Sequence, residues 1–329
     1  MKGRGRGGVN EAMKHSVDVN TLTKHYGEVA ALKETSFSVK KGELFGFIGP
    51  DGAGKTTLFR ILATLLLADS GNATVEGYEV VKDYRKIRRI IGYMPGRFSL
   101  YQDLSVEENL RFFATIFGTT IEENYDLVKD IYSQIEPFKT RKAGKLSGGM
   151  KQKLALSCAL IHKPEVLFLD EPTTGVDAVS RQEFWEMLKR LKAQGITIVV
   201  STPYMDEAGL CDRVALIQDG SIMQISTPEA VVEAYPMGLY SVITSDIYQL
   251  LHDLQKLPQT HSVFAFGQAA HLSYQKGKLS KQAVFDFLKE AGHRNVDIQQ
   301  IKPNIEDCFM ELMQKECPTS QKILLLSKT

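Results

Sequence analysis

The chain carries the stretch Gly49-Pro50-Asp51-Gly52-Ala53-Gly54-Lys55-Thr56-Thr57, a complete G-x-x-x-x-G-K-[ST] pattern between an apolar run at 44–48 and a helix-like run at 58–67. Glycines let successive backbone N–H groups point inward at phosphates, and the amino end of the following helix adds partial positive charge. Lys55 is expected to reach the β and γ phosphate oxygens, and the Thr56 hydroxyl is expected to hold Mg²⁺. The sequence therefore predicts a binding site for a nucleoside triphosphate over residues 49–57.

A second motif ends an apolar strand. The run Val166-Leu167-Phe168-Leu169 is too hydrophobic to alternate between two faces, which is typical of a strand in a parallel sheet covered on both sides. Asp170 follows at the carboxyl end of this strand, where it is expected to coordinate Mg²⁺. Glu171 is then placed to orient or deprotonate an attacking water, so the pair predicts hydrolysis of the bound nucleotide.

A third motif lies between these two. The stretch Lys145-Leu146-Ser147-Gly148-Gly149-Met150-Lys151-Gln152 precedes an apolar helix pattern that leads to the strand at 166. In this order the three motifs resemble the ATPase subunit of ATP-binding cassette (ABC) transporters, with a Walker A loop at 49–57, a signature at 146–150 and a Walker B strand at 166–171. The resemblance implies ATP and Mg²⁺ as cofactors. It also implies an α/β fold, a P-loop NTPase (RecA-like) core with an antiparallel β edge and a helical subdomain.

The same resemblance assigns roles to two smaller motifs. Tyr26 lies where the family keeps an aromatic ring that stacks on adenine, and the stretch 173–177, which ends at Asp177, matches the family's D-loop. Stacking on an aromatic face tolerates any base, so Tyr26 predicts affinity better than selectivity for ATP. A half-buried strand tyrosine without a ligand is the alternative role for Tyr26.

The signature implies a second subunit. In the family, the signature of one subunit closes on the ATP that is held by the Walker A loop of the other. That resemblance implies that the nucleotide of a neighbouring chain is contacted by the signature residues Leu146, Ser147, Gly148, Gly149 and Met150. Ser147 also fits the N-cap position of the helix that continues through Cys158, whose first amides would present a positive end to phosphate. One Walker A loop and one signature make two half-sites, so a dimer is implied.

The first departure from the family lies in the stretch Ile91-Gly92-Tyr93-Met94-Pro95-Gly96-Arg97-Phe98, which aligns with the Q-loop. The family's Q-loop glutamine contacts Mg²⁺ and the attacking water, but this chain has Gly96 at that position. Glycine has no side chain to offer as a ligand, so sensing of the γ-phosphate must use another group or be weakened. Gln102, six residues on, is a conceivable substitute.

The second departure lies in Val200-Ser201-Thr202-Pro203-Tyr204-Met205-Asp206-Glu207-Ala208, where the family normally carries a histidine, the H-switch, at the position of Pro203. In the family that histidine contacts the γ-phosphate and helps arrange the catalytic glutamate, whereas a proline side chain neither donates nor accepts a hydrogen bond. Removing one electrostatic contact of this kind often costs ~2.7 to 4 kcal/mol, or roughly 10² to 10³ in rate. Hydrolysis is therefore expected to be slowed more than binding.

The two departures bear on the identity of the partner. In a homodimer both composite sites would share both losses, whereas a paralogue in a heterodimer could bring an intact glutamine and histidine to one site. The heterodimer is slightly favoured on this ground. The alternatives are a slow homodimer and a subunit whose Glu171 hydrolyses ATP in a rearranged site.

Length and composition set broad limits. A chain of 329 residues with a net charge of +1 can bury a substantial core and is expected to hold two domains. The longest apolar stretch, at 61–68, is far short of the about 18 residues that would indicate a membrane span, so any transmembrane pathway belongs to other chains.

Residues 1–13 hold basic residues among glycines without the apolar core of a secretory signal, and we expect a disordered tail. The four cysteines form no C-x-x-C pair, which fits a reducing cytoplasm and argues against a metal site.

The motifs divide the chain into domains. We expect an ABC ATPase domain over 14–235 that includes a largely helical subdomain at about 97–162, where Ser105 and Glu108 are spaced as a capping box. Residues 98–117 are candidates for the interface with a membrane partner, although Phe112, Phe113 and Phe117 also fit the subdomain's own core. Motif content is lost beyond residue 236, and 236–329 is expected to form a small α+β accessory domain. Its expected strands are 239–244, 262–267 and 295–301, and its expected helices are 246–257 and 280–291.

Three functions are compatible with these observations. The leading one is an ATP-binding and ATP-hydrolysing subunit of an ABC export system, which powers a separate multi-span membrane permease through ATP-driven dimerisation. The segment 303–312 resembles one found near the end of drug-export-type ATPases and favours an exporter over an importer. Such a subunit would be cytoplasmic, peripheral on the inner face of the cell membrane, and no nucleic acid is expected as a partner.

The second function is a hydrolysis-impaired, ATP-dependent clamp paired with an active ATPase. Gly96 and Pro203 favour it, and the intact Glu171 opposes it. The third is a soluble, non-transport ABC ATPase of translation or DNA repair. Such proteins usually show two cassettes in one chain or a long coiled-coil or zinc insertion, and this sequence shows neither.

Overall fold

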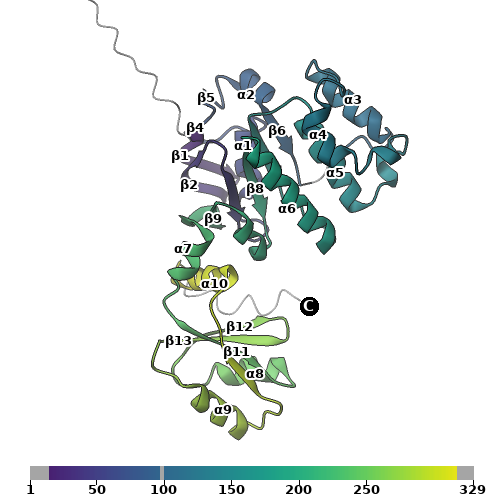
Figure 1. The fold of residues 1–329 in the computed structure, drawn as a ribbon. Helices are drawn as coiled ribbons and strands as arrows, with labels where there is room; N and C mark the ends of the chain where they lie inside the picture. The colour runs from purple at the N-terminus through teal and green to yellow at the C-terminus, as the bar shows by residue number, and fades with distance from the viewer. Residues whose placement is uncertain (1–14, 97–99, 317–329) are drawn as a thin grey trace, which may run out of the picture. The chain divides into compact units, whose positions relative to one another are not determined.

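The computed structural model describes residues 15–96 and 100–316, so the tail expected over 1–13 and the interface candidate Phe98 lie outside the described residues. The described chain divides into two compact units, one up to Pro228 and one from Glu229 onward (Figure 1). The sequence placed the boundary after residue 235, where motif content falls. The division falls at the start of helix α7 (Pro228–Glu233).

A six-stranded sheet forms the centre of the first unit. Its order is β10 (Ser221–Ser226), β9 (Arg213–Gln218), β3 (Leu44–Ile48), β8 (Thr197–Thr202), β7 (Val166–Asp170) and β6 (Ile91–Met94). Strands β9 to β6 run parallel, and β10 pairs antiparallel with β9. Every residue of β3, β7 and β8 is buried, as expected for a parallel sheet with both faces covered.

An antiparallel sheet covers one side of this core. Its order is β2 (Val29–Lys40), β1 (His15–Tyr26), β4 (Ser70–Val75) and β5 (Tyr78–Glu79). Four buried rings lead from this sheet through helix α1 (Lys55–Leu62) to the central strands. The ring centroids are 4.9 Å apart for Phe37 and Phe47, 5.9 Å for Phe47 and Phe59, and 6.0 Å for Phe59 and Phe168. This packing fixes α1, and with it the loop that precedes α1, on the end of β3.

Helices form a subdomain between β6 and β7. It contains α3 (Val106–Ile116), α4 (Tyr125–Tyr132) and α5 (Gly148–Leu160), with short 3₁₀ turns at Glu136–Phe138 and Ala143–Lys145. The capping box of Ser105 and Glu108 is present at the start of α3. The expectation of a core role was wrong for Phe112, which is 36 % exposed, and Phe113 and Phe117 are only half-buried. The buried apolar positions of α3 are instead spaced four apart, at Val106, Leu110 and Ala114, because that spacing keeps side chains on one helix face.

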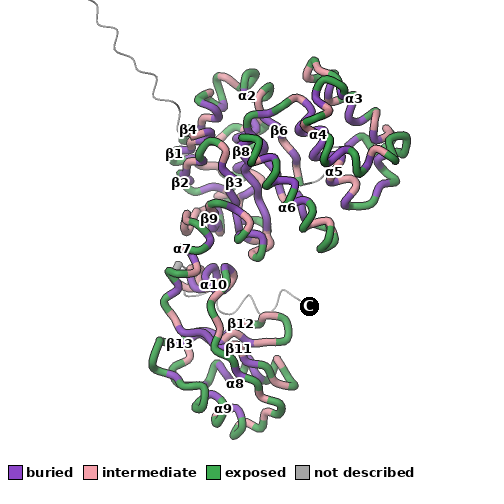
Figure 2. The backbone as a smooth tube through the Cα atoms, viewed as in Figure 1, coloured by how far each residue is buried: buried purple, intermediate pink, exposed green. Residues whose placement is uncertain are grey.

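Three further helical segments complete the first unit. Helix α2 (Tyr84–Ile90) precedes β6, and α6 (Ala178–Ala193) follows β7 and precedes β8 in the chain. Figure 2 shows buried and exposed stretches along α6, in which Phe184, Trp185 and Leu188 are fully or almost fully buried. The 3₁₀ segment η3 (Met205–Leu210) follows β8 directly. The segment after β7 thus leads into α6, and η3 begins three residues after the carboxyl end of β8.

The second unit is an α+β fold with one antiparallel sheet. Its elements follow the order β11 (Gly238–Ile243), α8 (Ile247–Leu254), β12 (Thr260–Phe266), β13 (Ala269–Tyr274), α9 (Lys281–Glu290), β14 (Asp297–Gln300) and α10 (Ile305–Glu316). The sheet order β12-β13-β11-β14 makes the first six elements a ferredoxin-like β-α-β-β-α-β unit. Sequence reasoning missed β13 because a tight turn at Gly267, with a φ of +60°, leaves almost no spacer between it and β12.

Candidate functional site

Three adjacent strands of the central sheet end at the site. β3 runs into the Walker A loop, β8 into Pro203 and β7 into Glu171, and β8 lies between the other two strands. The Gly49 N–H donates to the Thr202 carbonyl at 3.3 Å, and Asp170 is in register with Ser201. Because the strands are parallel, motifs that are more than 100 residues apart in sequence meet at one edge of the sheet.

Close backbone packing explains two glycines of the loop. A Cβ at Gly49 would lie 2.1 Å from the Ile217 carbonyl oxygen, and a Cβ at Gly54 would lie 2.3 Å from the Ala31 carbonyl oxygen. Gly54 also has a φ of +101°, which other residues rarely adopt. It is the N-cap of α1 and supplies no side-chain cap, so the first amides of α1 keep their capacity to bind an anion.

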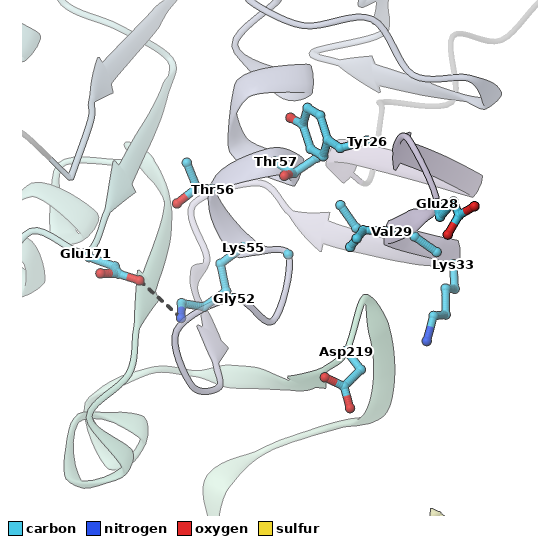
Figure 3. A pocket seen from close by; sticks show the side chains of 13 residues that line it. Tyr26, Glu28, Val29, Lys33, Gly52, Lys55, Thr56, Thr57, Glu171 and Asp219 are labelled. Atoms are coloured by element: carbon cyan, nitrogen blue, oxygen red, sulfur yellow. Dashed lines mark ion pairs between the residues drawn. The ribbon is translucent and has the colours of Figure 1, made fainter. Parts of the chain in front are cut away.

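Lys55 joins the loop to the Walker B strand. Its side chain is almost completely buried, and its ammonium donates to the carbonyl oxygens of Gly49 and Pro50, both at 2.8 Å. The same ammonium lies 3.1 Å from the Glu171 carboxylate, as the dashed line in Figure 3 shows. The residue predicted to bind phosphate and the residue predicted to act as the base are therefore in direct contact.

The two residues predicted to hold Mg²⁺ also meet. The Thr56 hydroxyl lies 3.2 Å from Asp170 Oδ1, which also accepts a hydrogen bond from the Ser201 hydroxyl at 2.8 Å. Hydroxyl and carboxylate oxygens suit Mg²⁺, which in such sites keeps several waters and phosphate oxygens as its other ligands. The oxygen donors at this position therefore fit the ion. Within 15–96 and 100–316 no cluster of three or more His, Cys, Asp or Glu side chains offers a metal site made of protein ligands alone.

Glu171 has an unusual backbone that its neighbours hold in place. Its φ is +49°, a conformation that costs a non-glycine residue on the order of 1–3 kcal/mol. The Glu171 N–H donates to both the carbonyl oxygen and the hydroxyl of Ser201, at 3.1 and 3.0 Å. In this conformation the Glu171 carboxylate lies 3.1 Å from the Lys55 ammonium.

A pocket with a cavity volume of about 660 Å³ opens beside the loop (Figure 3). Tyr26 lies in its wall at the end of β1 and is 46 % exposed, so its side chain is accessible from the pocket. Sequence reasoning missed six other lining residues: Glu28, Val29, Ala30, Ala31, Lys33 and Asp219. Only the turn at Asp219-Gly220 had a sequence signal, and its position is tertiary, since the Gly220 N–H donates to the Ala53 carbonyl at 3.1 Å.

The signature begins helix α5, as expected. Ser147 is the N-cap, and its hydroxyl accepts a hydrogen bond from the Met150 N–H at 3.3 Å. Leu146 and Gly149 are buried, whereas Ser147 and Gly148 are exposed. None of these residues is among those that line the pocket beside the chain's own Walker A loop. The structure therefore keeps the signature and the Walker A loop as two separate half-sites.

The D-loop begins helix α6. Asp177 is the N-cap and accepts hydrogen bonds from the Ser180 N–H at 3.0 Å and the Ser180 hydroxyl at 2.8 Å. The hydrogen bond from the Ser180 N–H is the main cause that lowers the pKa of Asp177, and the Ser180 hydroxyl adds to it. Asp177 is thus a charged cap on the surface of the subunit.

The two degenerate positions lie at the site. A Cβ at Gly96 would be 3.2 Å from the Asp170 carbonyl oxygen, so Gly96 packs against the end of β7. Gln102 is exposed, and its amide donates to the Leu100 carbonyl at 3.4 Å within its own loop. The hypothesis that Gln102 replaces the family's glutamine therefore gains no support from its contacts.

A buried carboxylate next to Pro203 was missed by sequence reasoning. Glu207 is 2 % exposed and accepts hydrogen bonds from the Thr202 hydroxyl at 2.5 Å and the Thr173 hydroxyl at 3.1 Å. Its other oxygen accepts from Arg181 Nε at 3.1 Å. Glu207 therefore ties together the loop after β7, the loop after β8 and helix α6, on both sides of Pro203.

Comparisons with known proteins agree with this geometry. The family model described as "ABC transporter" matches residues 32–174. The chain is 38 % identical over 305 residues to the probable multidrug ABC transporter ATP-binding protein YbhF of Escherichia coli (strain K12), which covers 90 % of this chain and 52 % of that protein. It is 32 % identical over 311 residues to the linearmycin resistance ATP-binding protein LnrL of Bacillus subtilis (strain 168), covering 90 % of this chain and 97 % of the relative. This chain belongs to the ABC transporter ATP-binding protein family.

A solved structure extends the likeness to the fold. The dimeric, post-hydrolysis structure of the ATP-binding cassette MJ0796 with ADP and Pi has a TM-score of 0.58 and 27 % identity to this chain. It covers 64 % of this chain and 98 % of the cassette. As an ABC ATPase, the chain has the nucleotide-binding fold that its Walker motifs predicted. The chain spans about half the length of the E. coli relative, and within the described residues no helix has the length and apolar character that crossing a membrane needs.

Proposed function

We propose that this chain is the ATP-binding and ATP-hydrolysing subunit of an ABC export system, and that it powers a separate multi-span permease through ATP-driven dimerisation. The observation that carries the proposal is the meeting of Lys55, Thr56, Asp170 and Glu171 at one sheet edge, with pair distances of 3.1 and 3.2 Å. Relatives named for multidrug transport and for linearmycin resistance support export as the direction.

Each residue of the site has a proposed task. Lys55 and the amides of residues 49–57 bind the phosphates, and Tyr26 stacks on the base. Thr56 and Asp170 hold Mg²⁺, which would neutralise charge on the phosphate oxygens. Phosphate binding draws the Lys55 ammonium away from Glu171, because the phosphate carries more charge than the carboxylate. Glu171 is then free to accept a proton from the attacking water.

A second subunit completes each site. Ser147, Gly148 and Gly149 would contact the nucleotide of the partner chain through the amino end of α5, while Asp177 lies at the same surface. The partner is a second ABC ATPase subunit, either the same chain or a paralogue. We place the dimer in the cytoplasm, bound peripherally to a permease at the inner face of the cell membrane, with the transport pathway in the permease.

A hydrolysis-impaired clamp paired with an active ATPase is the second candidate. Gly96 and Pro203 favour it, because neither residue offers a side-chain ligand. Gly96 faces the end of the Walker B strand, and Pro203 directly follows β8. Such a chain would bind ATP and close the dimer while its partner supplied most of the turnover. The intact Glu171 after β7 argues for a retained base and therefore for the first candidate.

The test measures phosphate release and ATP affinity on the purified chain, with Mg²⁺ present. Wild type should bind ATP and release phosphate, Lys55→Ala should lose binding, and Glu171→Gln should retain binding and lose turnover. Glu186→Gln is the matched control, because it makes the same chemical change at a surface ion pair with Lys189 on α6. Tight, Lys55-dependent binding without measurable turnover in wild type would select the clamp. Equal turnover in wild type and Glu171→Gln would overturn the assignment of the base.

A further inference from the structure

One face of the signature helix rests on the segment that follows the Walker B strand. A Cβ at Gly148 would lie 3.4 Å from the Gly175 carbonyl oxygen, and a Cβ at Gly149 would lie 2.7 Å from the Ser180 hydroxyl. Gln152 contacts the same segment at Pro172. Positions 148, 149 and 152 share one side of α5, since residues three and four apart are neighbours on a helix. The helix that starts with the signature is therefore packed along the segment that starts with Glu171.

The contact of Gln152 is a buried hydrogen bond. Its side chain has no exposed surface, and Nε2 donates to the Pro172 carbonyl oxygen at 2.7 Å. Pro172 immediately follows Glu171 and is itself buried. This carbonyl belongs to the peptide between Pro172 and Thr173, so a shift of it would move Pro172 and, through the rigid proline ring, the backbone that carries the Glu171 carboxylate. The bond thus joins α5 to the backbone of the residue that follows the proposed base.

The other polar atom of Gln152 suggests what the residue is for. Oε1 is buried and has no hydrogen-bond partner among the residues that the structure describes. An unpaired buried oxygen is unfavourable, and an aliphatic side chain would fill the same space without it. The bond to Pro172 is what a glutamine provides here and an aliphatic residue would not.

The opposite side of the same segment is anchored. The Thr173 hydroxyl donates to Glu207, which Thr202 and Arg181 also hold, and the Glu171 N–H is bonded to Ser201. None of these anchors belongs to α5. Gln152 thus supplies a side-chain hydrogen bond from the signature helix to Pro172. Residues of β8, α6 and η3 hold the rest of the segment.

We infer that Gln152 is a positioning residue that transmits engagement of the signature to Glu171. This inference rests on the proposed function. The nucleotide of the partner subunit binds the amino end of α5 and moves α5 as a rigid unit. Gln152 carries that movement to the Pro172 carbonyl. The base of the chain's own Walker half-site is then aligned only when its signature half-site is occupied. The two half-sites of one subunit are coupled through this hydrogen bond.

The experiment compares wild type with Gln152→Met, which has similar length but no donor, and with Gln152→Glu, which has similar shape but an acceptor facing the Pro172 carbonyl. Hydrogen–deuterium exchange is followed at 146–151 and at 169–176, with and without excess ATP and Mg²⁺. In wild type both segments should gain protection with ATP. In both variants the signature segment should keep its protection and 169–176 should lose it. Where turnover is measurable, kcat should fall by about 10- to 100-fold with an unchanged ATP Kd, as for a slightly misplaced base.

Ser157→Ala is the matched control, because it removes another hydrogen bond from a buried side chain of α5, one that stays within the helix by donating to the Lys153 carbonyl. It should behave as wild type in both segments. ATP-dependent protection of 169–176 that persists in both Gln152 variants, with kcat unchanged, would overturn the inference while leaving the proposed function intact. Failure of ATP to protect the wild-type signature segment would instead overturn the ATP-driven dimer, and the inference with it.

Discussion

Replacing Pro203 by histidine should increase ATP turnover. Residue 203 follows Thr202, which is in register with Ile48 of β3 and whose carbonyl accepts from the Gly49 N–H. The preceding residue, Ser201, is in register with Asp170 of β7. An imidazole at 203 would therefore emerge between the phosphate loop and Glu171, where it can donate to the γ-phosphate.

The size of the effect follows from the environment of Pro203. One aimed donor in a closed site is worth about 2.7 to 4 kcal/mol, or roughly 10² to 10³ in kcat. Pro203 is half-buried, and solvent weakens an electrostatic contact, so we expect the low end, about 10²-fold. ATP affinity should change much less, because the Lys55 and Thr56 contacts are unaltered.

The assay is steady-state phosphate release with ATP binding measured in parallel, on wild type, Pro203→His and Pro203→Ala. The alanine variant removes the ring constraint without adding a donor, so it isolates any backbone effect of losing the proline. We expect kcat to rise in the histidine variant and to stay near wild type in the alanine variant. If Pro203→His folds and binds ATP normally but turns over within threefold of Pro203→Ala, the reasoning that a missing donor limits hydrolysis is refuted.

Three further outcomes are expected from single contacts. Tyr26→Ala should weaken ATP binding by about 1–3 kcal/mol, roughly 5- to 150-fold in Kd, in fluorescence titration, whereas Tyr26→Phe keeps the ring and should bind like wild type. Glu207→Ala should destabilise the first unit by about 3 kcal/mol in urea unfolding, because Arg181 and the hydroxyls of Thr173 and Thr202 lose their acceptor; a midpoint equal to wild type would contradict this. Burial raises the pKa of the Cys308 thiol to about 12 and also raises the pKa of the Cys158 and Cys211 thiols. These three thiols should therefore resist alkylation at pH 8 until the protein is denatured. Modification of any of them in the native protein, detected by mass spectrometry, would count against their burial.

The sequence by itself determined the chemistry of the core site. The glycine spacing of residues 49–57 and the uninterrupted apolar run at 166–169 are local patterns, and a phosphate loop or a covered parallel strand imposes them wherever it occurs. For the same reason Ser147 and Ser105 could be predicted as helix caps, since a cap bonds within its own turn. Residue identity at Gly96 and Pro203 also sufficed to show which side-chain ligands the chain lacks.

The tertiary structure decided which residues meet. The sheet order places β8 between β3 and β7, and so places Pro203 between the loop and Glu171. The sequence of a single strand does not reveal this order. Glu207 and Gln152 had no sequence signal for their contacts, because Glu207 accepts from Thr202 and Gln152 donates to Pro172 through packing rather than through a local pattern. The turn at Asp219 could be predicted, but its place in the pocket wall could not. Phe112 shows the converse, since a hydrophobic residue in the middle of a helix can still face solvent when the buried stripe passes through Leu110 and Ala114. Local sequence patterns determine the chemical capacity of each residue, and long-range packing determines which groups that residue contacts.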